Sequence, residues 1–120
     1  MTEPVFSSLR NRACIVTGAG RGFGRLMALG LLRQGALVLG SAARNAGELA
    51  ETARLAVLTG TGRFVAAMAD VSSNADCERL VDTVMREFGR VDVLINNAAR
   101  GPREANEDFF VSRPSVLSRR

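Results

Sequence analysis

Four residue types are missing from this chain of 120 residues: lysine, histidine, tyrosine and tryptophan. Without histidine there is no Ser-His or Cys-His nucleophile pair, and without lysine or tyrosine there is no Schiff base and no amine or phenol proton relay. Arginine, the only basic residue type present, stays protonated at any working pH. Acid–base catalysis near neutral pH would therefore rest on carboxylates or thiols alone.

Cysteine is also scarce, and the two thiols are far apart in the sequence. Cys14 falls in a predicted strand and Cys77 in a predicted helix, a spacing that indicates neither a zinc site nor a redox pair. We expect two reduced, mostly buried thiols, no metal site and a cytoplasmic protein. The first residues contain no apolar segment typical of a signal peptide, and no apolar run approaches the 18 or so residues of a membrane span, so no membrane partner is expected.

The charge of the chain does not indicate a nucleic-acid partner. Sixteen basic residues against 12 acidic ones leave a formal net charge of +4. The arginines form no stripe along a predicted helix, and no cluster of aromatic residues offers a stacking platform for bases. We therefore expect no DNA or RNA partner.

Apolar residues alternate between short continuous runs and helical spacing. This alternation predicts βαβ units with a parallel sheet, hence an α/β protein of the doubly wound kind. Strands are expected at residues 13–17, 36–41, 63–69 and 91–96, and helices at residues 23–33 and 46–58, with a third helix whose apolar positions run from residue 77 to residue 88. Ser72 or Ser73 is expected to cap the last helix, and Gly89 to end it.

Helical spacing also predicts which residues face the sheet. Gly30 is expected on the inner face of the first helix, where it would allow close approach to a strand. The predicted inner faces consist of Phe23, Leu26, Met27, Gly30 and Leu31 in the first helix; Leu49, Ala53, Ala56 and Val57 in the second; and Cys77, Leu80, Val81, Val84, Met85 and Phe88 in the third.

The alternation of strands and helices stops near residue 99. Residues 100–120 are polar, contain two of the three prolines and hold one short apolar cluster. We therefore expect the N-terminal part of a domain at residues 1–99, followed by an irregular or disordered tail at residues 100–120.

A glycine-rich segment, TGAGRGFG, follows the first predicted strand and opens the first predicted helix. This context is typical of a dinucleotide-binding, Rossmann-like fold, in which the first N–H groups of the helix bind the pyrophosphate. Gly18 permits the tight turn, Gly22 lets the backbone approach the phosphates, and Gly24 lets the helix pack closely. The predicted cofactor-binding residues of this segment are Gly18, Gly20, Arg21, Gly22, Phe23 and Gly24.

The spacing T-G-x-x-x-G-x-G resembles the short-chain dehydrogenase/reductase family, and two further segments agree with it. Asp70 and Val71 follow the third predicted strand, where the family has an acidic residue beside the adenine pocket. The segment DVLINNAA resembles the family signature D-x-L-x-N-N-A-G, with Ala99 in place of the last glycine. The resemblance covers about residues 10–99. It implies that Asn97 lies beside the ribose and nicotinamide of the cofactor, although an asparagine that only secures the strand end would fit the same pattern.

The charges that follow the second strand favour NADP over NAD. NAD-binding proteins commonly place an acidic residue there for the ribose 2′-hydroxyl, whereas NADP requires a cation for the 2′-phosphate. Arg44 occupies this neighbourhood and no acidic residue does, while Arg21 adds a second guanidinium within the glycine segment. NADP is therefore the preferred cofactor and NAD is possible; the alternative is that Arg44 is an ordinary surface arginine.

The resemblance also implies what this chain lacks. Family members carry an active-site serine followed by Tyr-x-x-x-Lys after the N-N-A-G signature, and this chain has neither a tyrosine nor a lysine. We therefore expect no catalytic residue in this chain, which would be the cofactor half of an oxidoreductase with a sheet truncated after the fourth strand. The complete protein would act on a small carbonyl or alcohol substrate, as a homo-oligomer. The alternative is a non-catalytic dinucleotide-binding or regulatory module that pairs with a partner through the open edge of its fourth strand.

Overall fold

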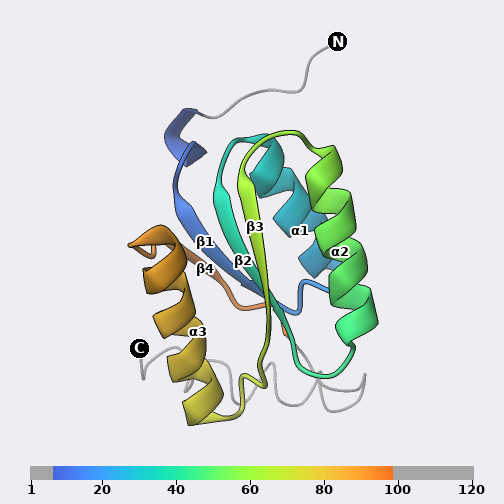
Figure 1. Cartoon of the computed structure of the whole chain (residues 1–120), viewed down its shortest axis with the longest axis vertical. Helices are drawn as coiled ribbons and strands as arrows, with labels where there is room; N and C mark the ends of the chain where they lie inside the picture. Colours follow the sequence, from blue (N-terminus) through green and yellow to red (C-terminus); the bar gives the residue numbers. More distant parts are fainter. Residues whose placement is uncertain (1–6, 99–120) are drawn as a thin grey trace.

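The computed structural model describes residues 7–98, which form a four-stranded parallel sheet with helices on both faces (Figure 1). The strand order is β3-β2-β1-β4, so the chain crosses the sheet between β3 and β4. The α/β class and the doubly wound parallel sheet predicted from the sequence are confirmed. The expected tail at residues 100–120 lies outside the described residues. The elements are η1 (Ser7–Leu9), β1 (Ala13–Thr17), α1 (Gly22–Arg33), β2 (Leu37–Ala42), α2 (Ala46–Leu58), β3 (Arg63–Met68), α3 (Asn74–Phe88) and β4 (Val93–Ile95).

Two helix boundaries follow directly from local chemistry. At α2, the side chain of Asn45 accepts a hydrogen bond from the Glu48 N–H at 2.9 Å. At α3, Ser73 accepts one from the Asp76 N–H at 3.2 Å, and Gly89 ends the helix in the left-handed conformation at φ +78°. Side chains of this type satisfy N–H groups that have no partner within the helix. The predicted ends of these two helices are therefore confirmed, with Ser73 rather than Ser72 as the cap.

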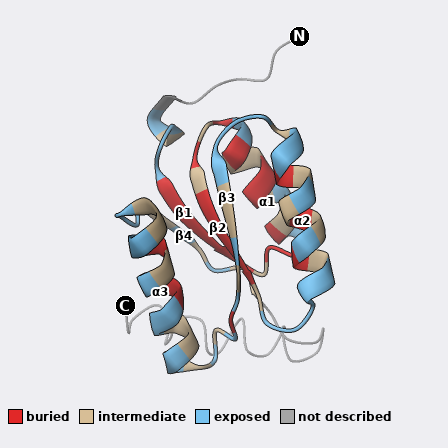
Figure 2. Ribbon diagram, in the orientation of Figure 1, coloured by how far each residue is buried: buried red, intermediate tan, exposed pale blue. Residues whose placement is uncertain are grey.

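The core lies in two layers, one on each face of the sheet (Figure 2). Every residue of β1 is buried, as expected for a central parallel strand covered from both sides. The layer under α3 is the smaller one, because α3 alone covers that face. Its buried residues are Ile15, Leu39, Ala69, Leu80 and Val84, whereas the layer under α1 and α2 contains Cys14, Val16, Ala19, Ala28, Leu29, Leu32, Ala36, Val38, Leu49 and Ala56.

The predicted inner face of α1 is wrong at Phe23, Leu26 and Gly30, whereas Leu31 packs against the core as predicted. Phe23 and Leu26 are 77% and 63% exposed, and a Cβ added at Gly30 would meet nothing within 4 Å. Apolar residues occur nearly all round this helix, so helical spacing alone allows more than one inner face. The face with the smaller side chains at its start packs on the sheet, because these allow a closer approach. The buried residues of α1 are Gly24, Ala28, Leu29 and Leu32.

The inner faces of the other two helices were predicted in part. In α2, Val57 is 78% exposed, while Thr52 is fully buried. Burial of the threonine is inexpensive because its hydroxyl donates a hydrogen bond to the Ala19 carbonyl at 2.8 Å. In α3, Val81 and Met85 are about half exposed, because within the described residues nothing covers that side of the helix.

Candidate functional site

The glycine segment forms the turn between β1 and α1, at the carboxyl ends of the parallel strands (Figure 1). Gly18 has a φ of +67°, and a Cβ there would lie 3.0 Å from the Cα of Ala98. A Cβ at Gly24 would lie only 1.8 Å from the Gly18 carbonyl oxygen. Gly22 has a φ of +57° and open space beside it. These three positions therefore require glycine, two for backbone conformation and one for close approach of α1 to the turn.

The start of α1 differs from the starts of α2 and α3. Arg21 occupies its N-cap position in an extended conformation and makes no capping hydrogen bond with its side chain. The N–H groups of Gly22, Phe23 and Gly24 come before the first helical hydrogen bond, which the Arg25 N–H donates to the Arg21 carbonyl at 3.2 Å. Open N–H groups and the positive end of the helix dipole together attract anions. This end of α1 is therefore suited to a phosphate group.

Two carbonyl groups of the same turn accept hydrogen bonds from side chains of α1 and α2. The guanidinium of Arg25 donates from Nη2 to the Gly20 carbonyl at 2.6 Å and to the Glu48 carbonyl at 3.0 Å, and from Nε to Thr52 Oγ1 at 2.9 Å. Thr52 donates in turn to the Ala19 carbonyl. The sequence reasoning missed both residues, because neither belongs to the glycine pattern. An arginine in the first turn of a helix is the signal that could have identified one of them.

The end of β4 is joined to the turn by side-chain hydrogen bonds. Asn97 donates from Nδ2 to the Gly18 carbonyl at 3.2 Å. The hydroxyl oxygen of Thr17 accepts hydrogen bonds from the N–H groups of Asn97, at 2.9 Å, and of Ala98, at 3.0 Å. The structure therefore places Asn97 directly beside the glycine turn, with Thr17 as the residue that holds it there. These bonds secure the end of β4, and a role beside the ribose and nicotinamide stays a prediction.

The two predicted arginines lie on neighbouring loops of this edge. Ser41 pairs with Thr17 in the sheet, and its carbonyl accepts a hydrogen bond from the Ala19 N–H at 2.8 Å. The loop that follows β2 therefore begins next to the glycine turn. Arg44 lies on this loop and is exposed, as is Arg21 on the turn itself. No acidic residue occurs between the end of β2 and Asn45.

Asp70 and Val71 follow β3, whose end pairs with the end of β2 through Met68 and Ala42. Asp70 is exposed, and its carboxylate accepts hydrogen bonds from the N–H and the hydroxyl of Ser72 at 2.9 and 2.7 Å. Val71 is half-buried, and its carbonyl accepts a weak bond from the Cys77 thiol at 3.3 Å. The predicted residues of all four segments therefore meet at one edge of the sheet, the one formed by the carboxyl ends of the strands.

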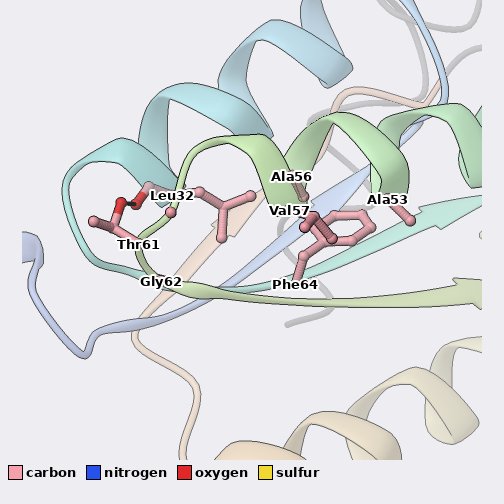
Figure 3. A pocket seen from close by; sticks show the side chains of 8 residues that line it. Leu32, Ala53, Ala56, Val57, Thr61, Gly62 and Phe64 are labelled. Atoms are coloured by element: carbon pink, nitrogen blue, oxygen red, sulfur yellow. Dashed lines mark hydrogen bonds between the residues drawn. The ribbon is translucent and has the colours of Figure 1, made fainter.

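A hollow of about 320 Å³ lies at the opposite edge of the sheet, where β3 begins (Figure 3). Its walls come from the last turns of α1 and α2 and from the start of β3, so it is separate from the glycine turn. The hollow is lined by Leu32, Ala53, Ala56, Val57, Gly60, Thr61, Gly62 and Phe64.

Among the described residues, no group of three or more histidine, cysteine or acidic residues is placed to hold a metal ion, and no helix is long and apolar enough to cross a membrane.

Known proteins resemble the chain in both sequence and structure. A family model described as short chain dehydrogenase matches residues 12–113. The short-chain dehydrogenase/reductase homolog YusS of Bacillus subtilis is 35% identical over 89 residues, which cover 74% of this chain and 81% of YusS. The rhamnolipids biosynthesis 3-oxoacyl-[acyl-carrier-protein] reductase of Pseudomonas aeruginosa is 40% identical over 110 residues, which cover 92% of this chain and 41% of that protein.

Solved structures show the same relation. The apo form of glucose dehydrogenase from Caenorhabditis elegans matches with a TM-score of 0.75 and 28% identity, covering 91% of this chain and 46% of that one. A short chain dehydrogenase from Mycobacterium smegmatis matches with a TM-score of 0.77 and 29% identity, covering 94% and 51%. The chain therefore spans about half the length of these proteins, although it spans most of YusS.

Proposed function

Because the chain belongs to the short-chain dehydrogenase family, a family of oxidoreductases, we propose that it is the cofactor-binding half of an NADP(H)-dependent oxidoreductase. In the complete protein, hydride would pass between the nicotinamide and a small carbonyl or alcohol substrate. The observation that supports this proposal is the start of α1, where N–H groups without a capping side chain follow a turn that requires glycine. The family resemblance and this geometry point to the same ligand.

We assign the pyrophosphate to the turn and the first residues of α1. The open space beside Gly22 would let phosphate oxygens approach the backbone, and the N–H groups of Gly22, Phe23 and Gly24 would donate to them. Gly18, Gly20 and Gly24 allow the close packing that shapes the turn. A nicotinamide dinucleotide, when bound, supplies the hydride chemistry that the side chains of this chain cannot. The protein's own contribution is to hold and orient the cofactor.

The other sites follow from the family pattern. Asn97, which is already bonded to the Gly18 carbonyl, would bind on the ribose and nicotinamide side. Asp70 and Val71 would bound the adenine pocket. Because the chain contains no tyrosine or lysine, it carries no counterpart of the family's Tyr-x-x-x-Lys, and we propose that it is inactive alone. A cytoplasmic location and a homo-oligomeric complete protein stay predictions.

The preference for NADP over NAD rests on two exposed cations at this edge. Arg44 and Arg21 lie on loops that follow neighbouring strands, and no acidic residue is there to bind a free ribose 2′-hydroxyl. A 2′-phosphate brings charge and strong acceptor oxygens that guanidinium groups bind well. Two solved structures that the chain resembles carry or use the other cofactor: one is an NAD⁺-bound xylitol dehydrogenase and one is an NADH-dependent reductase.

Calorimetric titration of the purified chain with NADP⁺ and NAD⁺ tests the proposal. We expect tighter binding of NADP⁺, and we expect Arg44→Asp to weaken NADP⁺ binding by about tenfold or more, because one charged hydrogen bond contributes about 1.5–3 kcal/mol. Arg86→Asp on α3 makes the same change in net charge away from this edge and serves as the control. Equal affinities for the two cofactors in the parent chain would refute the charge argument, and no binding of either would refute the proposed function.

Two observations favour a second candidate, a non-catalytic dinucleotide-binding module that pairs with a partner. YusS is a relative of which this chain spans 81%, and the outer edge of β4 has no neighbouring strand among the described residues. Intact mass spectrometry of the protein isolated from its source separates the two candidates. A mass near 12.8 kDa favours the module, whereas a mass about twice as large favours the cofactor half of an enzyme.

A further inference from the structure

The side chain of Arg25 poses a question that the glycine pattern does not answer. It is a cation in the first turn of α1, where the helix dipole disfavours positive charge. It is also half-buried, and its guanidinium is committed to three hydrogen bonds with the turn and α2. A surface arginine kept only for solubility would not be held in this way.

The three acceptors of Arg25 belong to two different segments. Nη2 donates to the carbonyl of Gly20 at 2.6 Å, within the turn, and to the carbonyl of Glu48 at 3.0 Å, in the first turn of α2. Nε donates to Thr52 Oγ1 at 2.9 Å. Arg25 therefore links the glycine turn to the helix that follows the next strand.

Thr52 completes this link from inside the protein. Its side chain is fully buried, and its hydroxyl has a single hydrogen, which is donated to the Ala19 carbonyl at 2.8 Å. Two consecutive carbonyl groups of the turn are thus held by side chains, that of Ala19 by Thr52 on α2 and that of Gly20 by Arg25 on α1. The contact is close, because a Cβ added at Gly20 would lie 3.3 Å from the Cβ of Glu48.

The direction of these carbonyl groups determines the direction of the next N–H groups. In a trans peptide the C=O and the following N–H point in opposite directions. Because Thr52 holds the Ala19 carbonyl, the N–H of Gly20 points away from Thr52. Because Arg25 holds the Gly20 carbonyl, the N–H of Arg21 points away from the Arg25 guanidinium. Two carbonyl oxygens, which would repel a phosphate, are therefore held toward Thr52 and Arg25, and the N–H groups of Gly20 and Arg21 point the other way. This part of the turn leads directly into the N–H groups of Gly22, Phe23 and Gly24, which we assign to the pyrophosphate.

We propose that Arg25 and Thr52 are positioning residues that hold the glycine turn in its anion-binding conformation. Neither side chain contacts the cofactor in this account; both act through the carbonyl groups of Ala19 and Gly20. The inference rests on the proposed dinucleotide-binding function and deepens it, because it makes α2 a support for the pyrophosphate site.

Three substitutions test the proposal with different chemistry. Thr52→Val keeps the shape of the side chain but removes the hydroxyl that binds Ala19. Arg25→Lys keeps the charge but loses the fork that reaches three acceptors. Arg25→Met removes the charge as well. Arg54→Met is the matched control, because Arg54 lies on the exposed side of α2 and pairs only with Glu51, one turn away.

Each variant is titrated with NADP⁺ and with 2′-AMP, which has the adenosine and the 2′-phosphate but no pyrophosphate. We expect Thr52→Val and Arg25→Lys to weaken NADP⁺ binding about tenfold, a change of the size that the loss of one hydrogen bond can cause. Binding of 2′-AMP should change less than twofold. Arg25→Met should be at least as weak as Arg25→Lys. Unchanged NADP⁺ affinity, or a parallel loss for both ligands, would overturn the proposal.

A second measurement needs no ligand and separates this proposal from the proposed function. Amide hydrogen exchange of the segment 18–24 should speed up in Thr52→Val and Arg25→Lys relative to the control, while exchange in β1 and β2 stays unchanged. If the parent chain binds neither cofactor, the proposed function fails, yet the exchange rates still decide whether these residues hold the turn. Equal exchange in all variants would overturn the positioning role.

Discussion

The central strands β1 and β2 and the outer strand β4 are attached to the molecule in different ways. All five residues of β1 are buried, and four of the six residues of β2 are, so apolar packing from both faces holds them (Figure 2). Strand β4 has three residues and none of them is buried. Its middle residue, Leu94, is 44% exposed.

Polar contacts at both ends compensate for the poor burial of β4. Before the strand, the Asp92 carboxylate accepts a hydrogen bond from the Ala13 N–H at 2.8 Å, and the Asp92 N–H donates to the Ala13 carbonyl at 2.8 Å. After the strand, Asn97 binds the Gly18 carbonyl and the Thr17 hydroxyl. The centre of the sheet is therefore stabilised mainly by apolar burial. The polar contacts of β4 instead fix where this strand lies, and they place Asn97 beside the glycine turn.

The largest difference is expected between matched leucine substitutions in the two regions. Leu39→Ala in β2 removes a fully buried side chain and should cost about 2–5 kcal/mol in the free energy of unfolding. Leu94→Ala in β4 should cost about 1 kcal/mol or less, because this side chain is already partly in water. Urea denaturation of both variants measures the two losses. Equal losses would show that β4 is packed as tightly as the centre.

A smaller difference is expected within α1, between the end that touches the turn and the outer face. Gly24→Ala places a Cβ against the Gly18 carbonyl and should cost about 1–3 kcal/mol or more, because backbone must shift. Gly30→Ala meets open space and should stabilise the helix by about 0.5–1 kcal/mol. Thermal unfolding of the two variants provides the measurement. The idea of a tight junction at Gly24 fails if both substitutions change the midpoint in the same direction.

The smallest effect concerns pH and the polar attachment of β4. The hydrogen bond from Arg90 and then the one from the Ala13 N–H lower the pKa of Asp92 in the folded protein. The stability from the ionised carboxylate is therefore present above the pKa of the unfolded chain and is lost as the pH falls through the lowered pKa of the folded state. Asp92→Asn should thus reduce the difference between the urea midpoints at pH 7 and at acid pH. Asp82→Asn on the exposed side of α3 controls for the change in net charge. If Asp92→Asn keeps the pH response of the parent, the pH dependence does not come from Asp92.

Local chemistry made several elements predictable. The bounds of α2 were predicted residue for residue, because Asn45 and the glycines after the helix mark its ends. The glycine turn and its place between β1 and α1 were predictable for the same reason, since a positive φ at Gly18 and close contact at Gly24 both require glycine. The face of α1 was not predictable in this way. Its apolar residues surround the helix, so only the sheet selects which of them are buried.

The amino-acid sequence by itself determined the order of strands and helices, the glycine turn and the absence of tyrosine and lysine, because each depends on residue identity over short distances. Tertiary structure alone decided that α1 packs through Gly24 and Ala28 and that β4 lies beside β1. It also brought Arg25 on α1 and Thr52 on α2, which are 27 positions apart, together at the back of the glycine turn. The physical reason is that a hydrogen bond between distant segments exists only once the sheet has set the distance between them.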